Sequence, residues 1–480
     1  MMRPKMQQKF NGLISDKDGH MRSHFLADAC GVIGVFGGST MSDDLSGGLH
    51  ALQHRGQKFS GAGVSREEGL RVFSGKGLIE GWNSSKKSFL EGDIGIGHVG
   101  MRDPQPVKHR SRFGELAVCF SGHLRNSSEV LADMLAEGRS FAEGSQTEVL
   151  SKVIGSRPDV TQGLEKAFQL FTGAFSLLVM TRDAIYAARD PRGIRPLMLG
   201  WRQAQWAVAS ESRALSDLEF QLSRDIEPGE VVRIDIDGVE TCSRIPSPRR
   251  AHCAFEWAYI AAQDSKIQGV WVRDARKRMG EALAAADHEA GLHFDVVAPV
   301  PRSGIGSALG YHAAGGVPYD ELFLDLRSFR WQDDALESPS YSGTSSLSVV
   351  VPAVRNRRIV LCDDSLVRGA QIKRRIKELR AAGAVEVHVR IACPPLIYPC
   401  DYGSSDGKAG EFMARQLIAH KDMDREDGLE KLEQNMARLI GSDTLRFNSM
   451  EKFVDAIGLD GKDLCLKCFD GRNPEAVESQ

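Results

Sequence analysis

The chain has 480 residues, of which 42 % are hydrophobic and 26 % are charged, and its formal net charge is −3. Because this balance creates no field that attracts a polyanion, nucleic-acid coating is excluded and we expect no nucleic-acid partner. No apolar run approaches the roughly 20 residues of a membrane-spanning helix, and the N-terminus lacks the apolar core of a secretory signal. We therefore expect a cytoplasmic protein without a membrane partner, in which the nine cysteines are thiols or metal ligands rather than disulfides.

Residues 1–29 are polar and mixed in charge, which predicts a propeptide-like leader segment. Short apolar, β-branched runs bounded by glycines follow it and are typical of strands. The predicted strands of this half lie at 30–38, 94–100, 116–123, 174–181, 184–190, 205–211 and 231–238, with helices near 42–54 and 127–137. Strands in runs, rather than in alternation with helices, predict a sheet-rich α+β domain over residues 30–250.

The second half has a different pattern, which starts after a break near 245–253. A helix is predicted at 272–288, and buried strands are predicted within 294–304, 357–369 and 385–395, with a helix after residue 370. Strand, helix and strand in succession form a βαβ unit, which implies a parallel sheet and an α/β domain. We place this domain at 251–400 and a helical, cysteine-containing tail at 401–480.

The most informative loop contains two adjacent acids, Asp363 and Asp364, at the end of a predicted buried strand. Adjacent acids repel each other, so they suit a partner such as ribose hydroxyls or a hydrated Mg²⁺. The loop then enters a helix, whose free N–H groups favour a phosphate; Arg368 adds positive charge and Gly369 permits close approach. On spacing alone, an ordinary strand-to-helix turn with solvated acids is the alternative.

Residues 359–370 resemble the phosphoribosyl pyrophosphate (PRPP) motif of type I phosphoribosyltransferases, above all that of the amidophosphoribosyltransferase family. The resemblance implies that the two acids hold the ribose hydroxyls and, with Ser303, the Mg²⁺. It also implies that the 5′-phosphate is held by Ser365, Arg368 and Gly369. The family continues with two threonines where this chain has Ala370 and Gln371, so some phosphate-binding hydroxyls are missing.

Two further PRPP elements of the family are altered. The family's Val-Pro-Asp-Ser-Gly, which holds pyrophosphate, reads Val-Pro-Arg-Ser-Gly here, with Arg302 in place of the acid and Ser303 kept. The family's closing loop begins with Lys-Asn-Arg-Tyr, and its counterpart here begins with Asp325 and keeps the arginine as Arg327. The change from lysine to Asp325 reverses a charge that the resemblance directs at pyrophosphate.

Cys30 precedes the first predicted strand, where a single cysteine is usually a core residue. Together with residues 51–57 (ALQHRGQ) and 190–197 (DPRGIRPL), however, it resembles the N-terminal-nucleophile (Ntn) glutamine amidotransferase domain of the same family. The resemblance implies a four-layer αββα fold and removal of the leader. It also implies that the Cys30 thiolate attacks the glutamine amide, with the freed α-amino group as base.

The glutamine pocket departs from the family pattern. The family's carboxylate-binding arginine is Gly100 here, its oxyanion asparagine is Ser121, and its amine-binding aspartate is Gln146, whereas the oxyanion glycine is kept as Gly122. One oxyanion donor contributes about 2.7–4 kcal/mol and a charge-assisted contact about 1.5–3 kcal/mol. We therefore expect an impaired glutaminase site.

Near the C-terminus lies a Cys-x-x-Cys pair, which alone fits a redox pair or half a zinc site as well as a cluster. In family members with an iron–sulfur cluster, four cysteines stand in matching contexts. The resemblance therefore implies a structural [4Fe–4S] cluster on Cys253, Cys400, Cys465 and Cys468.

The family reaction converts PRPP, glutamine and water into phosphoribosylamine, glutamate and pyrophosphate, the first step of de novo purine synthesis, and ammonia can replace glutamine. The resemblance further implies purine nucleotides as regulators and a homo-oligomer. One alternative is a divergent paralogue that binds a phosphoribosyl nucleotide or a protein partner without glutamine hydrolysis. The second alternative is a structural subunit that binds no ligand.

Overall fold

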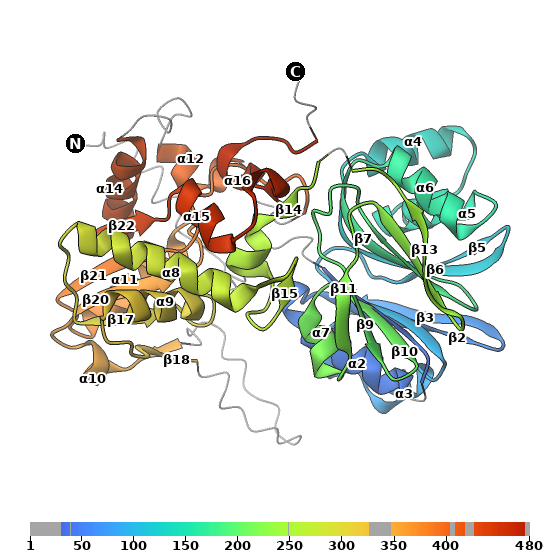
Figure 1. Cartoon of the computed structure of the whole chain (residues 1–480), viewed down its shortest axis with the longest axis horizontal. Helices are drawn as coiled ribbons and strands as arrows, with labels where there is room; N and C mark the ends of the chain where they lie inside the picture. Colours follow the sequence, from blue (N-terminus) through green and yellow to red (C-terminus); the bar gives the residue numbers. More distant parts are fainter. Residues whose placement is uncertain are drawn as a thin grey trace. The chain divides into compact units, whose positions relative to one another are not determined.

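The computed structural model describes residues 30–38, 40–247, 249–325, 347–403, 409–417 and 427–475. The predicted leader at 1–29 and the candidate Arg327 lie outside these ranges. The described residues form two compact units, each with its own sheets (Figure 1). The double-sheet unit comprises 30–273, 399–403 and 457–475, and the parallel-sheet unit comprises 274–325, 347–398, 409–417 and 427–456.

The double-sheet unit contains two antiparallel sheets. The first has the strand order β11 (Gln221–Asp225), β9 (Met198–Arg202), β10 (Gln205–Ala209), β1 (Gly31–Phe36), β4 (Ile94–Gly100), β2 (Phe59–Arg66) and β3 (Gly69–Lys76). The second has the order β13 (Gly238–Arg244), β12 (Glu230–Asp235), β8 (Ile185–Arg189), β7 (Gly173–Met180), β6 (Gly114–Leu124) and β5 (Val107–Ser111). Cys30 directly precedes β1, which is a central strand of its sheet.

Helices cover the outer faces of the two sheets. The helix α2 (Met41–Ala51) contacts β1 and β4, and α5 (Gln146–Gly155) contacts β5 and β6. Two more helices, α4 (Ser127–Ala136) and α6 (Val160–Leu170), bury apolar faces in the same cluster as β6 and β7. Between the sheets lies a second apolar cluster that includes Val32, Leu178 and Ile185. This arrangement confirms the predicted αββα architecture.

The parallel-sheet unit is built on β17 (Val296–Pro299), β20 (Arg358–Asp363), β21 (Glu386–Ile391) and β22 (Thr444–Phe447), all parallel and adjacent in that order. The helices α8 (Val272–Glu289) and α9 (Ile305–Gly315) share an apolar cluster with β17 and β20. Near the other edge lie α11 (Ala370–Ala381) and α14 (Gly428–Ile440), which contact β21 and β22 respectively (Figure 1). The predicted α/β fold with a parallel sheet is confirmed.

The ranges that the sequence analysis predicted as strands and helices are all occupied by elements of the predicted type. Elements that the sequence did not predict include the β2–β3 hairpin, the helices α5, α6, α9 and α14, and the fourth parallel strand β22. They also include the short antiparallel pair β18 (Phe323–Asp325) and β19 (Leu347–Val349). Within the described ranges, no helix combines the length and apolar character needed to cross a membrane.

Candidate active sites

The paired acids lie where β20 ends, in the parallel-sheet unit. The Ser303 hydroxyl donates a hydrogen bond of 3.0 Å to Oδ1 of Asp363, and the backbone N–H of Asp364 donates to the same oxygen at 2.9 Å. The Ser365 hydroxyl donates to the carboxylate of Asp364. The structure therefore brings together four of the predicted PRPP-site residues, from two loops that are far apart in the sequence.

Close backbone packing fixes these two loops against each other. The N–H of Val300 donates to the carbonyl of Cys362 at 2.7 Å. A Cβ on Gly304 would lie 2.1 Å from that same carbonyl oxygen, so only glycine fits there. The loop that carries Ser303 is consequently positioned by β20 itself.

Burial raises the pKa of the Asp363 carboxyl well above its usual range, and the neighbouring Asp364 raises it further. Burial also raises the pKa of Asp364, which is only 4 % exposed. Two buried, adjacent carboxyls gain from a cation or from hydroxyl donors that offset their mutual repulsion. The site is thus electrostatically suited to a ligand that brings positive charge or hydroxyl groups.

The predicted phosphate loop leads directly into α11. Gly369, just before this helix, has a φ of 76°, and a Cβ there would lie 2.4 Å from Cε of Met413. Arg368 is exposed, and its guanidinium pairs with the carboxylate of Glu411. Both predicted residues therefore lie at the N-terminal end of the helix, where its dipole favours an anion.

Cys30 is 5 % exposed, and its main chain is held from two sides. Its carbonyl oxygen accepts a hydrogen bond of 3.0 Å from Nε of Arg55 and one of 2.5 Å from the Ser121 hydroxyl. Ser121, predicted from the sequence to replace an oxyanion asparagine, thus binds the protein's own backbone. Gly122 has a φ of 138°, and a Cβ on it would lie 1.9 Å from the carbonyl oxygen of Ala174, so this position requires glycine.

A side chain at position 100, where the sequence predicts the loss of an arginine, would crowd the side chains of His98 and Cys30. A Cβ on Gly100 would lie 2.4 Å from Cε1 of His98 and 3.1 Å from Sγ of Cys30. Gly56 packs against the same backbone, since a Cβ on Gly56 would lie 2.4 Å from Cα of Gly100. His98 is fully buried, neither of its ring nitrogens has a hydrogen-bond partner among the described residues, and burial lowers its pKa to about 3.

Gln146, predicted from the sequence to replace an amine-binding aspartate, makes its contacts within the protein. Its Oε1 accepts a hydrogen bond of 3.0 Å from the N–H of Leu124, and its Nε2 lies 3.1 Å from Nδ1 of His123. The uncharged amide therefore links α5 to the end of β6, and it offers no charge to a substrate ammonium group.

A buried ion-pair network beside Cys30 is a feature to which the sequence analysis assigned no role. The Arg55 guanidinium binds Glu211 at 2.6 Å and Glu256 at 2.8 Å, and Nη1 of Arg195 lies 3.4 Å from Glu256. All four side chains are buried. The two arginines belong to the motifs at 51–57 and 190–197. Their positive charge within these motifs was the sequence signal that could have indicated a buried ion pair.

The four candidate cluster cysteines all belong to the double-sheet unit. Cys253 on β14 (His252–Cys253) is the parallel register partner of Cys465 on β23 (Leu464–Cys465). Burial and the nearby thiols of Cys253 and Cys400 raise the pKa of Cys465, and an ion pair between Asp401 and Lys467 joins the two segments that carry Cys400 and Cys468. In the described part of the chain, no group of three or more His, Cys, Asp or Glu side chains is arranged to hold a metal ion.

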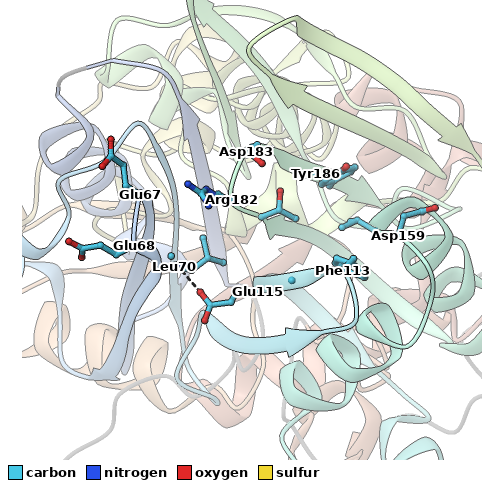
Figure 2. Close-up of a pocket in the computed structure, with 13 residues that line it drawn as sticks. Glu67, Glu68, Leu70, Phe113, Glu115, Asp159, Arg182, Asp183 and Tyr186 are labelled. Atoms are coloured by element: carbon cyan, nitrogen blue, oxygen red, sulfur yellow. Dashed lines mark hydrogen bonds between the residues drawn. The ribbon is translucent and has the colours of Figure 1, made fainter.

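A hollow of about 520 Å³ in the double-sheet unit is distinct from these sites (Figure 2). Its lining includes the acids Glu67, Glu68, Glu115, Asp159 and Asp183. Glu115 is already engaged, because it accepts a hydrogen bond of 3.0 Å from the N–H of Leu70 (Figure 2). It also pairs with Lys108. None of the predicted site residues lines this hollow.

Comparison with known proteins identifies both units. A family model described as a glutamine amidotransferase domain matches residues 96–217. The solved structure of glutamine PRPP amidotransferase from Bacillus subtilis, complexed with ADP and GMP, superimposes with a TM-score of 0.82 at 34 % identity, covering 93 % of this chain and 97 % of that one. The two units thus define an Ntn-type glutamine amidotransferase joined to a phosphoribosyltransferase fold.

Curated relatives give the particular family. Amidophosphoribosyltransferase of Bacillus subtilis is 34 % identical over 473 residues, which cover 94 % of this chain and 95 % of that protein. The enzyme of the same name from Methanothermobacter thermautotrophicus is 32 % identical over 470 residues, covering 94 % and 96 %. The chain belongs to the amidophosphoribosyltransferase family. Nothing in these comparisons supports the alternative of a paralogue with different chemistry.

Proposed function

We propose that this protein forms phosphoribosylamine from PRPP in the first step of purine synthesis, and that it uses ammonia better than glutamine. The observation that carries the proposal is the contrast between the intact Ser303–Asp363–Asp364 constellation and the occupied glutamine pocket around Gly100, Ser121 and Gln146. Family membership supports the overall reaction.

On the phosphoribosyl side, the two aspartates accept hydrogen bonds from the ribose hydroxyls. The hydroxyl of Ser303 and the carboxylate oxygens of Asp363 and Asp364 are hard ligands of the kind that Mg²⁺ prefers. The raised pKa values that burial gives the two acids support this assignment, because a bound cation offsets their repulsion. The cation would balance the negative charge of the leaving pyrophosphate.

On the glutamine side, Cys30 is kept as the nucleophile and Gly122 as one backbone oxyanion donor. The three substituted positions make no charged contact with glutamine, which lowers the rate of amide hydrolysis. Loss of one oxyanion donor alone lowers kcat about 100- to 1,000-fold.

A [4Fe–4S] cluster fits the donor set of Cys253, Cys400, Cys465 and Cys468. Thiolates are the usual protein ligands of such a cluster, and these four would hold it. The buried Nε of Arg195 supports the assignment, since no described residue accepts a hydrogen bond from it. Burial lowers the pKa of Arg195, but the Cys253 thiol, Glu256 and the Cys400 thiol raise it by more. The cluster would have a structural role.

The cluster assignment is tested by iron analysis of anaerobically purified protein. We expect iron and sulfide in the full-length chain, and loss of both in Cys465→Ser and Cys468→Ser, while Cys242→Ser retains them. Zinc in place of iron, or equal iron in all variants, would contradict the assignment.

Purine nucleotides as regulators, a homo-oligomeric state and a cytoplasmic location remain predictions. The complex of the Bacillus subtilis relative with ADP and GMP supports the first of these.

The main experiment measures phosphoribosylamine formation from PRPP and Mg²⁺ with ammonia, and then with glutamine. We expect turnover with ammonia, and a glutamine-dependent kcat/KM about 100-fold or more below that of the Bacillus subtilis enzyme. Cys30→Ala should remove the residual glutamine-dependent rate and leave the ammonia-dependent rate unchanged. Glutamine use equal to that of the relative would overturn the glutamine half of the proposal, and no reaction with either donor would overturn all of it.

A further inference from the structure

Arg368, at the entrance to α11, is paired with an acid of the protein itself. Its guanidinium forms an ion pair with the carboxylate of Glu411, the last residue of the 3₁₀ turn η5 (Ala409–Glu411). The Arg368 side chain is 47 % exposed and that of Glu411 is 33 % exposed, so the pair is open to solvent. Because a solvent-exposed ion pair contributes little free energy, an anion from solution can displace the Glu411 carboxylate.

The segment that carries Glu411 is fixed against the loop that precedes α11. The N–H of Met413 donates a hydrogen bond of 2.8 Å to the carbonyl of Val367. The Met413 side chain packs on Gly369, since a Cβ there would lie 2.4 Å from Cε of Met413. Phe412 and Met413 are both buried. This anchoring directly follows Glu411 in the chain, so the backbone itself keeps the carboxylate within reach of the guanidinium.

The start of α11 offers an anion more than the guanidinium alone. The N-cap of this 12-residue helix is Gly369, which has no side chain to accept hydrogen bonds from the first N–H groups. The positive end of the helix dipole lies at the same loop. A phosphate monoester can bind a guanidinium through two oxygens and helix N–H groups through a third. A ligand phosphate therefore gains more than the Glu411 carboxylate that it displaces.

We propose that Glu411 competes with the 5′-phosphate of the ligand for Arg368, and that this competition lowers the affinity for PRPP. The proposal rests on the proposed function, because it takes a phosphoribosyl compound as the ligand of this loop. Without ligand, the Glu411 carboxylate neutralises the Arg368 guanidinium. On binding, the guanidinium exchanges the carboxylate for the phosphate, and breaking the ion pair reduces the net gain.

The competition acts on binding and not on the chemical step. The 5′-phosphate keeps its charge while the bond between the ribose and pyrophosphate breaks, so Glu411 affects the bound substrate and the transition state equally. Glu411→Gln should therefore lower the KM for PRPP in the ammonia-dependent reaction and leave kcat within about twofold. Loss of a merely structural contact would not tighten binding.

The test is calorimetric titration of the full-length protein with ribose 5-phosphate in the presence of Mg²⁺. The variants are Glu411→Gln, Arg368→Gln and the double variant, with Glu451→Gln on the exposed surface of α15 (Met450–Ile457) as a matched control. Glu411→Gln should bind ribose 5-phosphate about two- to fivefold more tightly than the unmodified protein. In the Arg368→Gln background the same change should alter the affinity by less than about 1.5-fold, because no guanidinium is left to compete for.

Three outcomes would overturn the proposal alone. Equal or weaker binding by Glu411→Gln would mean that Glu411 supports Arg368 instead of competing for it. Equal tightening in Glu451→Gln, or in the Arg368→Gln background, would mean that the effect is one of general charge. If the unmodified protein binds neither ribose 5-phosphate nor PRPP, the proposed function fails and this proposal fails with it. Binding by the unmodified protein thus separates the two cases.

Discussion

The acid loop of the parallel-sheet unit and the surroundings of Cys30 in the double-sheet unit differ in what their polar groups bind. At the acid loop, hydrogen bonds between Ser303, Asp363 and Asp364 position groups that still suit a sugar phosphate. In the proposed glutamine pocket, Ser121 and Gln146 satisfy groups of the protein itself. The same backbone fold can therefore keep one site ready for its ligand while the other becomes internally bonded.

The largest effect is expected for the double variant Asp363→Asn/Asp364→Asn. PRPP binding and ammonia-dependent turnover should fall about 100-fold or more, because two charge-assisted contacts become neutral ones. Stability should rise at the same time, since burial and mutual repulsion disfavour the two charges. Calorimetry and thermal unfolding measure both, with the exposed Asp455→Asn as control. Loss of stability together with binding would show that the acids are structural.

The next prediction concerns a single reversion, Gly100→Arg, and whether it restores the proposed glutamine pocket. Gly100→Arg should lower the free energy of unfolding by about 1–3 kcal/mol, because its Cβ would clash with His98 and Cys30. It should not restore glutamine hydrolysis. Denaturant unfolding and a glutaminase assay check the two parts. A stable variant with restored glutaminase activity would mean that the pocket is only one substitution away from function.

Close to pH 6.5, the smallest effect is a pH dependence of stability caused by His98. Its folded pKa of about 3 lies below the unfolded value near 6.5, so below pH 6.5 the unfolded chain binds a proton that the folded chain does not. The free energy of unfolding should therefore fall, through His98, by about 1.4 kcal/mol per pH unit as the pH drops from about 6.5 towards 3. Urea unfolding of His98→Leu should show a shallower slope, whereas exposed His50→Gln should match the unmodified protein. Equal slopes in all three would contradict the assignment.

Much of the fold followed from patterns within single segments of the sequence. The strands β1, β4, β7 and β20 are composed mostly of apolar residues and glycine, and α11 repeats Ile372, Ile376 and Leu379 at helical spacing. The missed strand β22 has four residues, Thr444–Phe447, with no apolar run, and it becomes a strand by pairing in parallel with β21. Short elements whose structure depends on a distant partner give no such local pattern.

The candidate sites show the same contrast between features visible in a single segment and features that depend on distant contacts. Local sequence patterns brought attention to Asp363 and Asp364, whereas Cys30 was singled out only by the resemblance to a known family. The sequence could not show that His98 fills the space beside Gly100, or that Arg302 faces Asp325, because both facts depend on contacts between separate strands or loops. The role of Arg195 was equally hidden, since its burial and its neighbour Glu256 come from tertiary packing.

The pairing of β14 with β23 has a consequence for how the molecule is made. Residues near position 253 leave the ribosome long before those near 465, yet the two strands are neighbours in the double-sheet unit. The segment around Cys253 must therefore wait, with one backbone edge unpaired, until residues 464–465 have been synthesised. Nascent chains halted before residue 457 would expose that edge to chaperones and to aggregation.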